Sequence, residues 1–371
     1  LISCKTIIGY GSPNKAGKAS SHGAALGDDE VALVRKKLKW KYKPFEIPKE
    51  IINEWRQIGE KGTIKEKKWN KIYNKKSKKI KDEFLRVIND KLPEKFEKLI
   101  QGQKEKFFSS RLNLATRRSS ANVLEEITSS LPELIGGSAD LSGSNNTNTK
   151  FSKIIKPSNF KGNYIHYGVR EHAMAGIMNG LALHKGIIPY GGTFLIFLDY
   201  CKPALRLSSL MGLKVIYIFS HDSIGLGEDG PTHQPIEHLA HLRAIPNLNV
   251  FRPADTIETL DCWEIALKNI NTPSVIALSR QKLPFITETL TKKNMCSLGA
   301  YEVKKNDSNP EVTLIASGSE VQIAIEAFNK LKENNINSKV VSMPCQELFN
   351  QQSIKYKEEI LEKNSLKISI K

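Results

Sequence analysis

The sequence predicts an α/β protein with doubly wound, mostly parallel sheets and a second, smaller α/β domain. Short apolar runs alternate with helical patterns from residue 111 to about 286, which is typical of a parallel sheet. The same alternation resumes at residue 299. A length of 371 residues exceeds one ordinary domain, so two or three domains are expected.

Residues 1–30 are expected to be the remnant of a larger domain. An apolar run at residues 4–9 is expected to end a strand, and a loop rich in Gly and Ser follows it. His22 lies among small residues in this loop, where an isolated His is usually just solvated. The chain starts without Met and without a signal-peptide pattern, so we expect it to begin inside a longer protein.

Residues 31–110 are expected to form a charged helical connector. Pro44, Pro48 and Pro93 divide the helical pattern into separate pieces. Five aromatic side chains in this segment need a covering partner, which argues against a flexible linker: Trp40, Tyr42, Phe45, Trp55 and Trp69.

Residues 111–286 are expected to form the larger α/β domain. Strands are expected at residues 134–137, 164–168, 187–190, 215–219, 249–251 and 274–278. Helices are expected after Ser119 and Ser120, from Glu171, over 194–211 and over 256–269.

Residues 299–371 are expected to form the smaller domain. Its strands are expected at 312–316, 339–343 and 366–370, with helices over 317–334 and 352–362. An unpaired edge strand is a liability, so we expect this domain to be incomplete.

The formal net charge of +17 is concentrated in one segment. Residues 35–106 hold 24 Lys and Arg against 11 Asp and Glu, which leaves only +4 for the rest of the chain. No nucleic-acid motif accompanies this segment, so we interpret it as solvated surface and expect no nucleic-acid partner. No apolar run reaches the roughly 20 residues that span a bilayer, so no membrane contact is expected. Five scattered Cys without a C-x-x-C pair favour a reducing, intracellular setting.

The loop at residues 220–235 is the best candidate binding site that the residues alone indicate. It follows an apolar strand and reads Ser-His-Asp-Ser-Ile-Gly-Leu-Gly-Glu-Asp-Gly-Pro-Thr-His-Gln-Pro. Ligands bind at the carboxyl ends of strands in open α/β sheets. His221, Asp229 and His233 can donate to or accept from a hydroxylated substrate, while a solvated loop with unrelated polar residues remains the alternative.

Four motifs, in order along the chain, resemble the transketolase family of thiamine-diphosphate enzymes. They are Gly-Gly-Ser-Ala-Asp-Leu at 136–141, Tyr-Ile-His-Tyr-Gly-Val-Arg-Glu at 164–171, the 220–235 loop, and Ser-Arg-Gln at 279–281. Residues 6–22 are similar to the end of the family's diphosphate-binding domain, and residues 111–286 to its pyrimidine-binding domain. The resemblance implies the family's thiamine-diphosphate-binding fold. It also implies reversible transfer of a two-carbon ketol unit from a ketose phosphate, such as xylulose 5-phosphate, to an aldose phosphate, such as ribose 5-phosphate or erythrose 4-phosphate.

The resemblance also implies catalytic roles for Glu171, His22 and His233. Glu171 matches the carboxyl group that favours the imino form of the cofactor's aminopyrimidine ring. From the residue alone, a Glu that opens a helix can instead be a partner of the helix dipole. His22 resembles a His that touches cofactor and substrate and can move protons. The carbanion chemistry itself belongs to thiamine diphosphate.

Cofactor binding is assigned by the same resemblance to an aromatic pocket. Phe194, Phe197 and Tyr200 are expected to share a helix face and to stack the pyrimidine ring. From spacing alone, aromatic residues on one helix face more often belong to the hydrophobic core than to a cofactor site. Asp140 matches a carboxylate near the cofactor, with a turn or cap role as the alternative.

Because the implied substrates are sugar phosphates, the site needs cations where the phosphate group binds, away from the reacting carbons. Four residues match the family's phosphate-end ligands, two of them Arg with a bidentate fork: Arg117, Ser144, His221 and Arg280. Asp229 and His233 resemble groups that contact the hydroxyl and carbonyl oxygens. A turn role for Ser144 stays open.

The family's Gly-Asp-Gly motif, which holds Mg²⁺ or Ca²⁺ through the diphosphate, is absent together with its Asn ligand. We therefore expect no metal ligand in this chain and place the ligands in an N-terminal domain outside it. The intact protein is expected to be a cytoplasmic homodimer of the pentose phosphate pathway with the cofactor at the subunit interface. The chain by itself is expected to be inactive. The alternatives are deoxyxylulose-phosphate synthase, a 2-oxo acid dehydrogenase subunit and a basic, non-enzymatic binding module.

Overall fold

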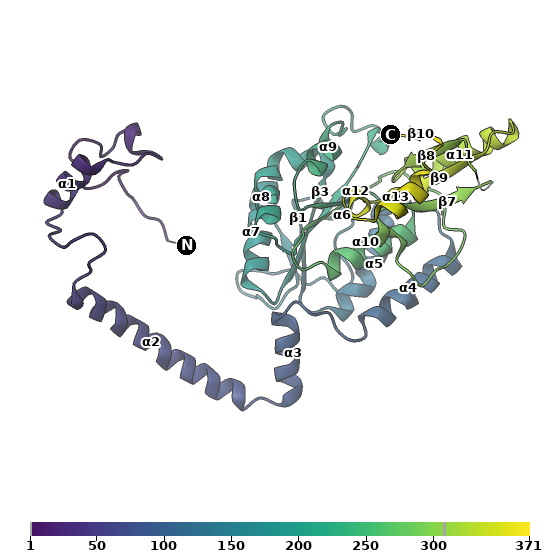
Figure 1. The fold of residues 1–371 in the computed structure, drawn as a ribbon. Helices are drawn as coiled ribbons and strands as arrows, with labels where there is room; N and C mark the ends of the chain where they lie inside the picture. The colour runs from purple at the N-terminus through teal and green to yellow at the C-terminus, as the bar shows by residue number, and fades with distance from the viewer. Residues whose placement is uncertain (1, 307–308) are drawn as a thin grey trace. The chain divides into compact units, whose positions relative to one another are not determined.

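The computed structural model describes residues 2–306 and 309–371, and the chain divides into two compact units, residues 1–81 and 82–371 (Figure 1). The first unit contains the 3₁₀ turn η1 (Ala19–Ser21) and the helices α1 (Asp28–Lys37) and α2 (Lys49–Asn74). The strand expected at residues 4–9 does not form. The chain instead turns there, because Tyr10 N–H donates to the Ile7 carbonyl at 3.2 Å and Gly9 takes a φ of +64°.

The loop that follows this turn is anchored to α1 through Glu30. The Glu30 carboxylate accepts a hydrogen bond from the Ser12 hydroxyl. It also accepts from the backbone nitrogen and from the side-chain nitrogen of Asn14, both at 2.9 Å. These donors, Ser12 first, lower the pKa of Glu30 to about 2. The carboxylate therefore stays ionised and holds the loop in one conformation at neutral pH.

Helix α2 is solvated along its whole length, since none of its residues is buried. Trp55 on this helix is 70% exposed, and Phe45 just before it is fully exposed. The expectation that these two aromatic side chains are covered is therefore wrong within this unit. Apolar side chains of α2 are likewise solvent-exposed: Trp55, Ile58, Ile64, Trp69 and Ile72.

The second unit is built on a six-stranded sheet in which every hydrogen-bonded pair of strands is parallel. The strand order is β2-β1-β3-β4-β6-β5, which confirms the mostly parallel, doubly wound prediction. The strands are β1 (Leu134–Ser138), β2 (Tyr164–His166), β3 (Ile188–Phe194), β4 (Ile216–Ser220), β5 (Asn249–Phe251) and β6 (Ser274–Leu278).

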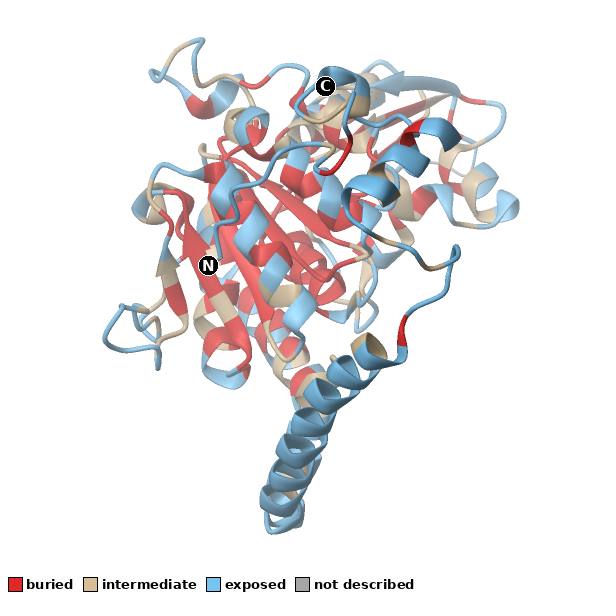
Figure 2. Ribbon diagram, turned by 90° about the vertical axis from the view of Figure 1, so that its left-hand side faces the viewer, coloured by how far each residue is buried: buried red, intermediate tan, exposed pale blue. Residues whose placement is uncertain are grey.

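Helices cover both faces of this sheet, and Figure 2 shows its strands as the buried centre of the unit. Side chains of β4 alternate between two cores: Ile216 and Ile218 join the helices α4, α5 and α10, while Tyr217 and Phe219 join α7 and α8. The helices are α3 (Lys78–Ile88), α4 (Phe96–Ser110), α5 (Thr116–Ser130), α6 (Ser142–Asn145), α7 (Glu171–His184), α8 (Leu198–Leu210), α9 (His238–Arg243) and α10 (Thr256–Lys268), with 3₁₀ turns η2 (Leu195–Phe197), η3 (Ile224–Leu226) and η4 (Met295–Leu298).

The segment expected to be one helix over 194–211 begins differently. Phe194 is the last residue of β3, Phe197 lies in η2, and α8 starts at Leu198. The reason is that β3 is paired with β4 from Tyr190 to its last residue, Phe194, which lies opposite Ser220. Phe194, Phe197 and Tyr200 therefore do not share a helix face.

The smaller sheet has the strand order β10-β8-β9-β7. Its strands β7 (Tyr301–Lys305), β8 (Val312–Ala316), β9 (Ser338–Ser342) and β10 (Leu366–Ser369) are parallel except for β7, and the helices are α11 (Glu320–Glu333), α12 (Gln346–Asn350) and α13 (Ile354–Leu361). Arg252, after β5, joins the two sheets, because its guanidinium pairs with Asp222 at 2.8 Å and also with Glu320 of α11. Among the described residues, no helix is both long and apolar enough to cross a membrane.

Candidate functional site

The candidate site lies at the carboxyl ends of the central strands of the six-stranded sheet. β3, β4 and β6 are neighbours, with Phe194 opposite Ser220 and Ser220 opposite Leu278. The segments that follow these strands leave the same edge of the sheet, where α/β folds bind ligands. They carry the aromatic residues, the 220–235 loop and Arg280.

Aromatic rings and imidazoles form one cluster at this edge. Phe194 and Phe197 are stacked, with ring centroids 5.6 Å apart and an angle of 9° between their planes. His221 lies 3.8 Å from the Phe194 ring, and His233 meets Phe197 edge-on at 5.5 Å. Tyr200 is 5.7 Å from Phe197 and exposed. Phe194 is buried, whereas Phe197 is partly exposed and Tyr200 exposed, and such rings suit a flat heteroaromatic ligand.

Glu171 is the first residue of α7 and its side chain is buried, with the residue only 6% exposed. Its charge contributes, after burial, to raising the pKa of the Cys201 thiol to about 12, so the carboxylate lies within electrostatic reach of α8. The positive end of the helix dipole favours an anion at this position. Burial with little solvation is also what a carboxyl group needs to interact strongly with a ligand.

A buried relay fixes the imidazole of His221. Asn145, at the end of α6, donates from its amide nitrogen to the Thr193 carbonyl at 2.7 Å and to the Ser220 hydroxyl at 2.8 Å. The Ser220 hydroxyl lies 2.8 Å from Nδ1 of His221. With the Ser220 hydroxyl as the donor, Nδ1 accepts and Nε2 carries the N–H of the neutral ring.

The charge state of His221 agrees with this relay. Burial first, and then the positive charge of Arg117, lower the pKa of His221 to about 4, although Asp229 opposes the shift. His221 is therefore neutral at physiological pH. It also has a φ of +62°, a left-handed conformation that is uncommon for a residue with a side chain.

Two guanidinium groups lie close to the imidazole cluster. Burial and then Arg280 lower the pKa of Arg117, so the two cations influence one another. Arg117 donates from Nη1 to the Ser144 carbonyl at 2.7 Å, and Arg280 makes an exposed ion pair of 3.3 Å with Glu228. These two cations, with Glu228 and Asp229 as exposed anionic neighbours, are suited to binding a phosphate group.

The remaining predicted residues are placed as follows. Asp140 is exposed just after β1 and has a φ of +63°, which fits a turn position. Ser144 lies in α6, and the structure shows its carbonyl, rather than its hydroxyl, facing Arg117. Asp229 is exposed in the loop but close enough to influence both His221 and Arg117. His22 is exposed in the first unit, and its role at the site stays a prediction.

Sequence reasoning missed Asn145 and Ser220. Both are fully buried and polar, and both orient His221 instead of facing a ligand themselves. Ser220 was inside the predicted loop, but an Asn in a turn-like Ser-Gly-Ser-Asn sequence gives no signal of long-range contact. The contact becomes visible only when β1, β3 and β4 lie side by side.

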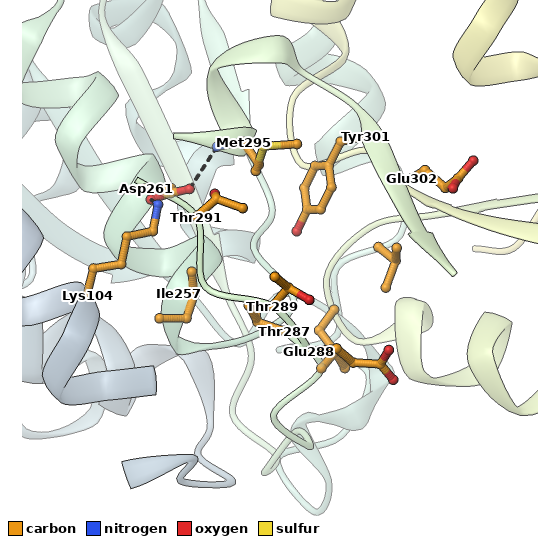
Figure 3. A pocket seen from close by; sticks show the side chains of 12 residues that line it. Lys104, Ile257, Asp261, Thr287, Glu288, Thr289, Thr291, Met295, Tyr301 and Glu302 are labelled. Atoms are coloured by element: carbon orange, nitrogen blue, oxygen red, sulfur yellow. Dashed lines mark hydrogen bonds and ion pairs between the residues drawn. The ribbon is translucent and has the colours of Figure 1, made fainter. Parts of the chain in front are cut away.

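A separate pocket of about 210 Å³ lies away from this edge, where α4, α10 and β7 meet (Figure 3). Lys104 and Asp261 form a buried ion pair of 2.8 Å in its wall. Tyr301 and Glu302 line the opposite side. None of the predicted site residues lines this pocket, so it is not part of the candidate site.

Comparison with known proteins identifies the family. Residues 113–285 match the pyrimidine-binding domain of transketolase, residues 1–93 match its thiamine-diphosphate-binding domain, and residues 299–371 match the transketolase-like C-terminal domain. The chain belongs to the transketolase family. The resemblance expected from the four motifs is thereby confirmed.

Individual relatives agree with this assignment. A transketolase of Sinorhizobium medicae is 50% identical over 97% of this chain and 52% of its own length, and one of Rhodobacter capsulatus is 47% identical over 100% and 55%. A crystal structure of Pichia stipitis transketolase in complex with sedoheptulose 7-phosphate matches with a TM-score of 0.89 and 37% identity, over 98% of this chain and 54% of that one. The chain thus spans about half the length of the curated relatives that it matches.

Proposed function

We propose that the complete protein catalyses the transketolase reaction, the transfer of a two-carbon ketol unit from a ketose phosphate to an aldose phosphate. The observation that carries this proposal is the single cluster of stacked Phe rings, neutral His221 and paired Arg side chains at the carboxyl edge of the sheet. Such a cluster combines an aromatic surface for a cofactor with cations for a phosphorylated substrate.

The residues present fit the pyrimidine half of thiamine diphosphate. Phe194 and Phe197 offer stacked rings, and Glu171 offers a buried carboxyl group at a helix N-terminus. When bound, thiamine diphosphate supplies a carbon centre that can take up and release the ketol unit. The divalent cation that accompanies it, Mg²⁺ or Ca²⁺, is proposed to bind to residues outside this chain.

The chain's own residues would bind and orient the reactants. Glu171 would hold a proton against the aminopyrimidine ring and so control which ring nitrogen is protonated. His221 would donate its Nε2–H to the phosphorylated substrate, since the relay from Asn145 leaves that hydrogen free. Arg117 and Arg280 would bind the phosphate, and the partial burial of Arg117 would strengthen its contact.

Other predicted residues would act nearer the reacting carbons. Asp229 and His233 are proposed to contact hydroxyl and carbonyl oxygens of the sugar, with His233 moving a proton. The Nδ1 atom of His233 lies 2.9 Å from the Thr232 hydroxyl, which can orient the ring. His22 is proposed to contact both cofactor and substrate, Tyr200 to border the aromatic pocket, and Asp140 and Ser144 to line the cofactor and phosphate ends.

We also propose that the complete protein is a cytoplasmic homodimer. Support comes from apolar side chains on the outer surfaces of α7 and α8, which pack against each other. Within the described residues these side chains are solvent-exposed: Ile177, Leu183, Tyr200, Leu207 and Leu210. An exposed apolar patch on two adjacent helices favours a protein–protein interface.

The test is Glu171→Gln in the complete protein, with Glu105→Gln, an exposed position on α4, as control. We expect turnover of xylulose 5-phosphate with ribose 5-phosphate to fall by about 10²- to 10⁴-fold, because Gln cannot exchange a proton. Titration with thiamine diphosphate should show cofactor binding retained. Near-normal turnover would remove Glu171 from its role, and turnover of pyruvate without xylulose 5-phosphate activity would favour a 2-oxo acid dehydrogenase instead.

A further inference from the structure

A second cluster of potential ligand atoms lies where α8 and α9 begin. Asp199 is the second residue of α8, Glu237 is the N-cap of α9, and His238 is its first residue. One ring nitrogen of His238 and one carboxylate oxygen from each acidic residue lie within 4.8 Å of one another. None of the three has a cofactor or substrate role in the proposal above.

The imidazole of His238 is the observation that points to a ligand. The residue is only 2% exposed, and neither Nδ1 nor Nε2 has a hydrogen-bond partner among the described residues. Buried imidazole nitrogens normally find a donor or an acceptor, so two unpartnered nitrogens in one ring are unusual. Both nitrogens face carboxylates: Nε2 lies 3.3 Å from Asp199 Oδ1, and Nδ1 lies 3.9 Å from Glu237 Oε2.

We propose that Asp199, Glu237 and His238 bind a divalent transition-metal cation, for which zinc is the test ion. Zinc bonds to nitrogen and oxygen of about 2.0 to 2.2 Å, arranged tetrahedrally, place two ligand atoms about 3.3 to 3.5 Å apart. The Nε2–Oδ1 distance of 3.3 Å has this value. Both carboxylates are about half-exposed, so Glu237 can rotate toward the ion and water can complete the coordination shell.

The chemistry of the three ligands selects the kind of cation. An imidazole with two carboxylates favours zinc and its first-row neighbours over Mg²⁺, which prefers an all-oxygen shell and retains its water. Lys202 lies close enough to influence Glu237, and a bound cation would have to outweigh its charge.

A cation here would connect the two segments that form the candidate site. Asp199 follows Phe197 by two residues, and Glu237 closes the loop that carries His233. The ion would therefore pin the end of this loop to the first turn of α8. Its expected role is to position the loop, independently of whether the protein transfers ketol units.

The test is zinc binding by the complete, chelator-treated protein in the presence of excess Mg²⁺, measured by equilibrium dialysis and calorimetry. His238→Gln removes the nitrogen ligand at similar side-chain volume. His184→Gln, at the exposed end of α7, is the matched control. Zinc bound by the exposed thiol of Cys4 is a background common to all proteins compared.

We expect the parent and His184→Gln to bind one more zinc ion per chain than His238→Gln, or to bind it at least about 10-fold more tightly. Asp199→Asn, an exposed change that leaves the buried ring in place, should weaken binding to a similar extent. X-ray absorption at the zinc edge should show one imidazole ligand that His238→Gln removes. Equal stoichiometry and affinity in all four proteins would overturn the proposal and leave a simple ion pair between Asp199 and His238.

Discussion

The carboxyl group of Glu258 on α10 offers a quantitative test of how the smaller sheet is held. It is 1% exposed and accepts hydrogen bonds from the Tyr301 hydroxyl at 2.7 Å, the Ser342 hydroxyl at 2.5 Å and the Ala254 N–H at 2.7 Å. Tyr301 and Ser342 belong to β7 and β9. In Glu258→Gln the oxygen can still accept from Ala254, and both hydroxyls can rotate to accept from the new amide.

The magnitude follows from the pKa of Glu258. Burial first, and then the neighbouring Asp255, raise this pKa from 4.5 to about 7. A group whose pKa is higher in the folded state stabilises the fold at low pH, and that stabilisation is lost as the pH rises through about 7. At about 1.4 kcal/mol per pKa unit the full effect is about 3 kcal/mol, and about 2.5 kcal/mol of it falls between pH 5 and 8.5.

Gln at position 258 does not titrate, so the free energy of unfolding of Glu258→Gln relative to that of the parent should increase with pH. We expect the difference in free energy of unfolding, variant minus parent, to increase by about 2.5 kcal/mol from pH 5 to pH 8.5. Urea unfolding followed by tryptophan fluorescence measures it, since Trp263 lies on the same helix. The control is Glu326→Gln on the exposed side of α11. A difference that is constant with pH would refute the reasoning.

Two further predictions concern the contacts that join the site to the rest of the fold. Arg252→Met should lower the free energy of unfolding by about 3 to 5 kcal/mol, because it leaves Asp222 and Glu320 without their cation. Urea unfolding measures this change, and the control Arg206→Met, at an exposed position, should alter the free energy of unfolding little. Asn145→Ala should raise the KM for sugar phosphates more than it lowers kcat, because the His221 ring loses its orientation, and it should cost about 1 to 3 kcal/mol of stability from the unpartnered Thr193 carbonyl. Ser220→Ala should reproduce the KM effect, and an unchanged KM in both variants would contradict the proposed relay.

Periodicity predicted the sheet because the strands β3, β4, β5 and β6 are buried along their whole length. The apolar run at 215–219 became β4, which supplies both cores, and the helix expected over 256–269 corresponds to α10. The secondary structure of such segments can be predicted from their own apolar pattern. The same reasoning failed for residues 4–9, where the positive φ of Gly9 and local hydrogen bonds turn the chain. It also failed for Phe194, where pairing with β4 overrides helical spacing.

The candidate site was predictable only in part. His221, Arg117 and Arg280 were expected from motifs, and the structure brings them within electrostatic reach of one another. The residues that support them were not, because Asn145 and Ser220 act through contacts between strands that are distant in sequence. The lower pKa of His221 likewise depends on burial and on Arg117, neither of which a motif specifies.

The left-handed backbone at His221 makes this position costly to the folded chain. A residue with a Cβ at φ +62° costs about 1 kcal/mol or more relative to glycine. If the imidazole serves the proposed reaction, selection for thermal stability alone would favour glycine at position 221, whereas selection for turnover would favour histidine. Selection of variants for thermal stability alone would then favour replacement of His221, the residue that the proposed reaction needs.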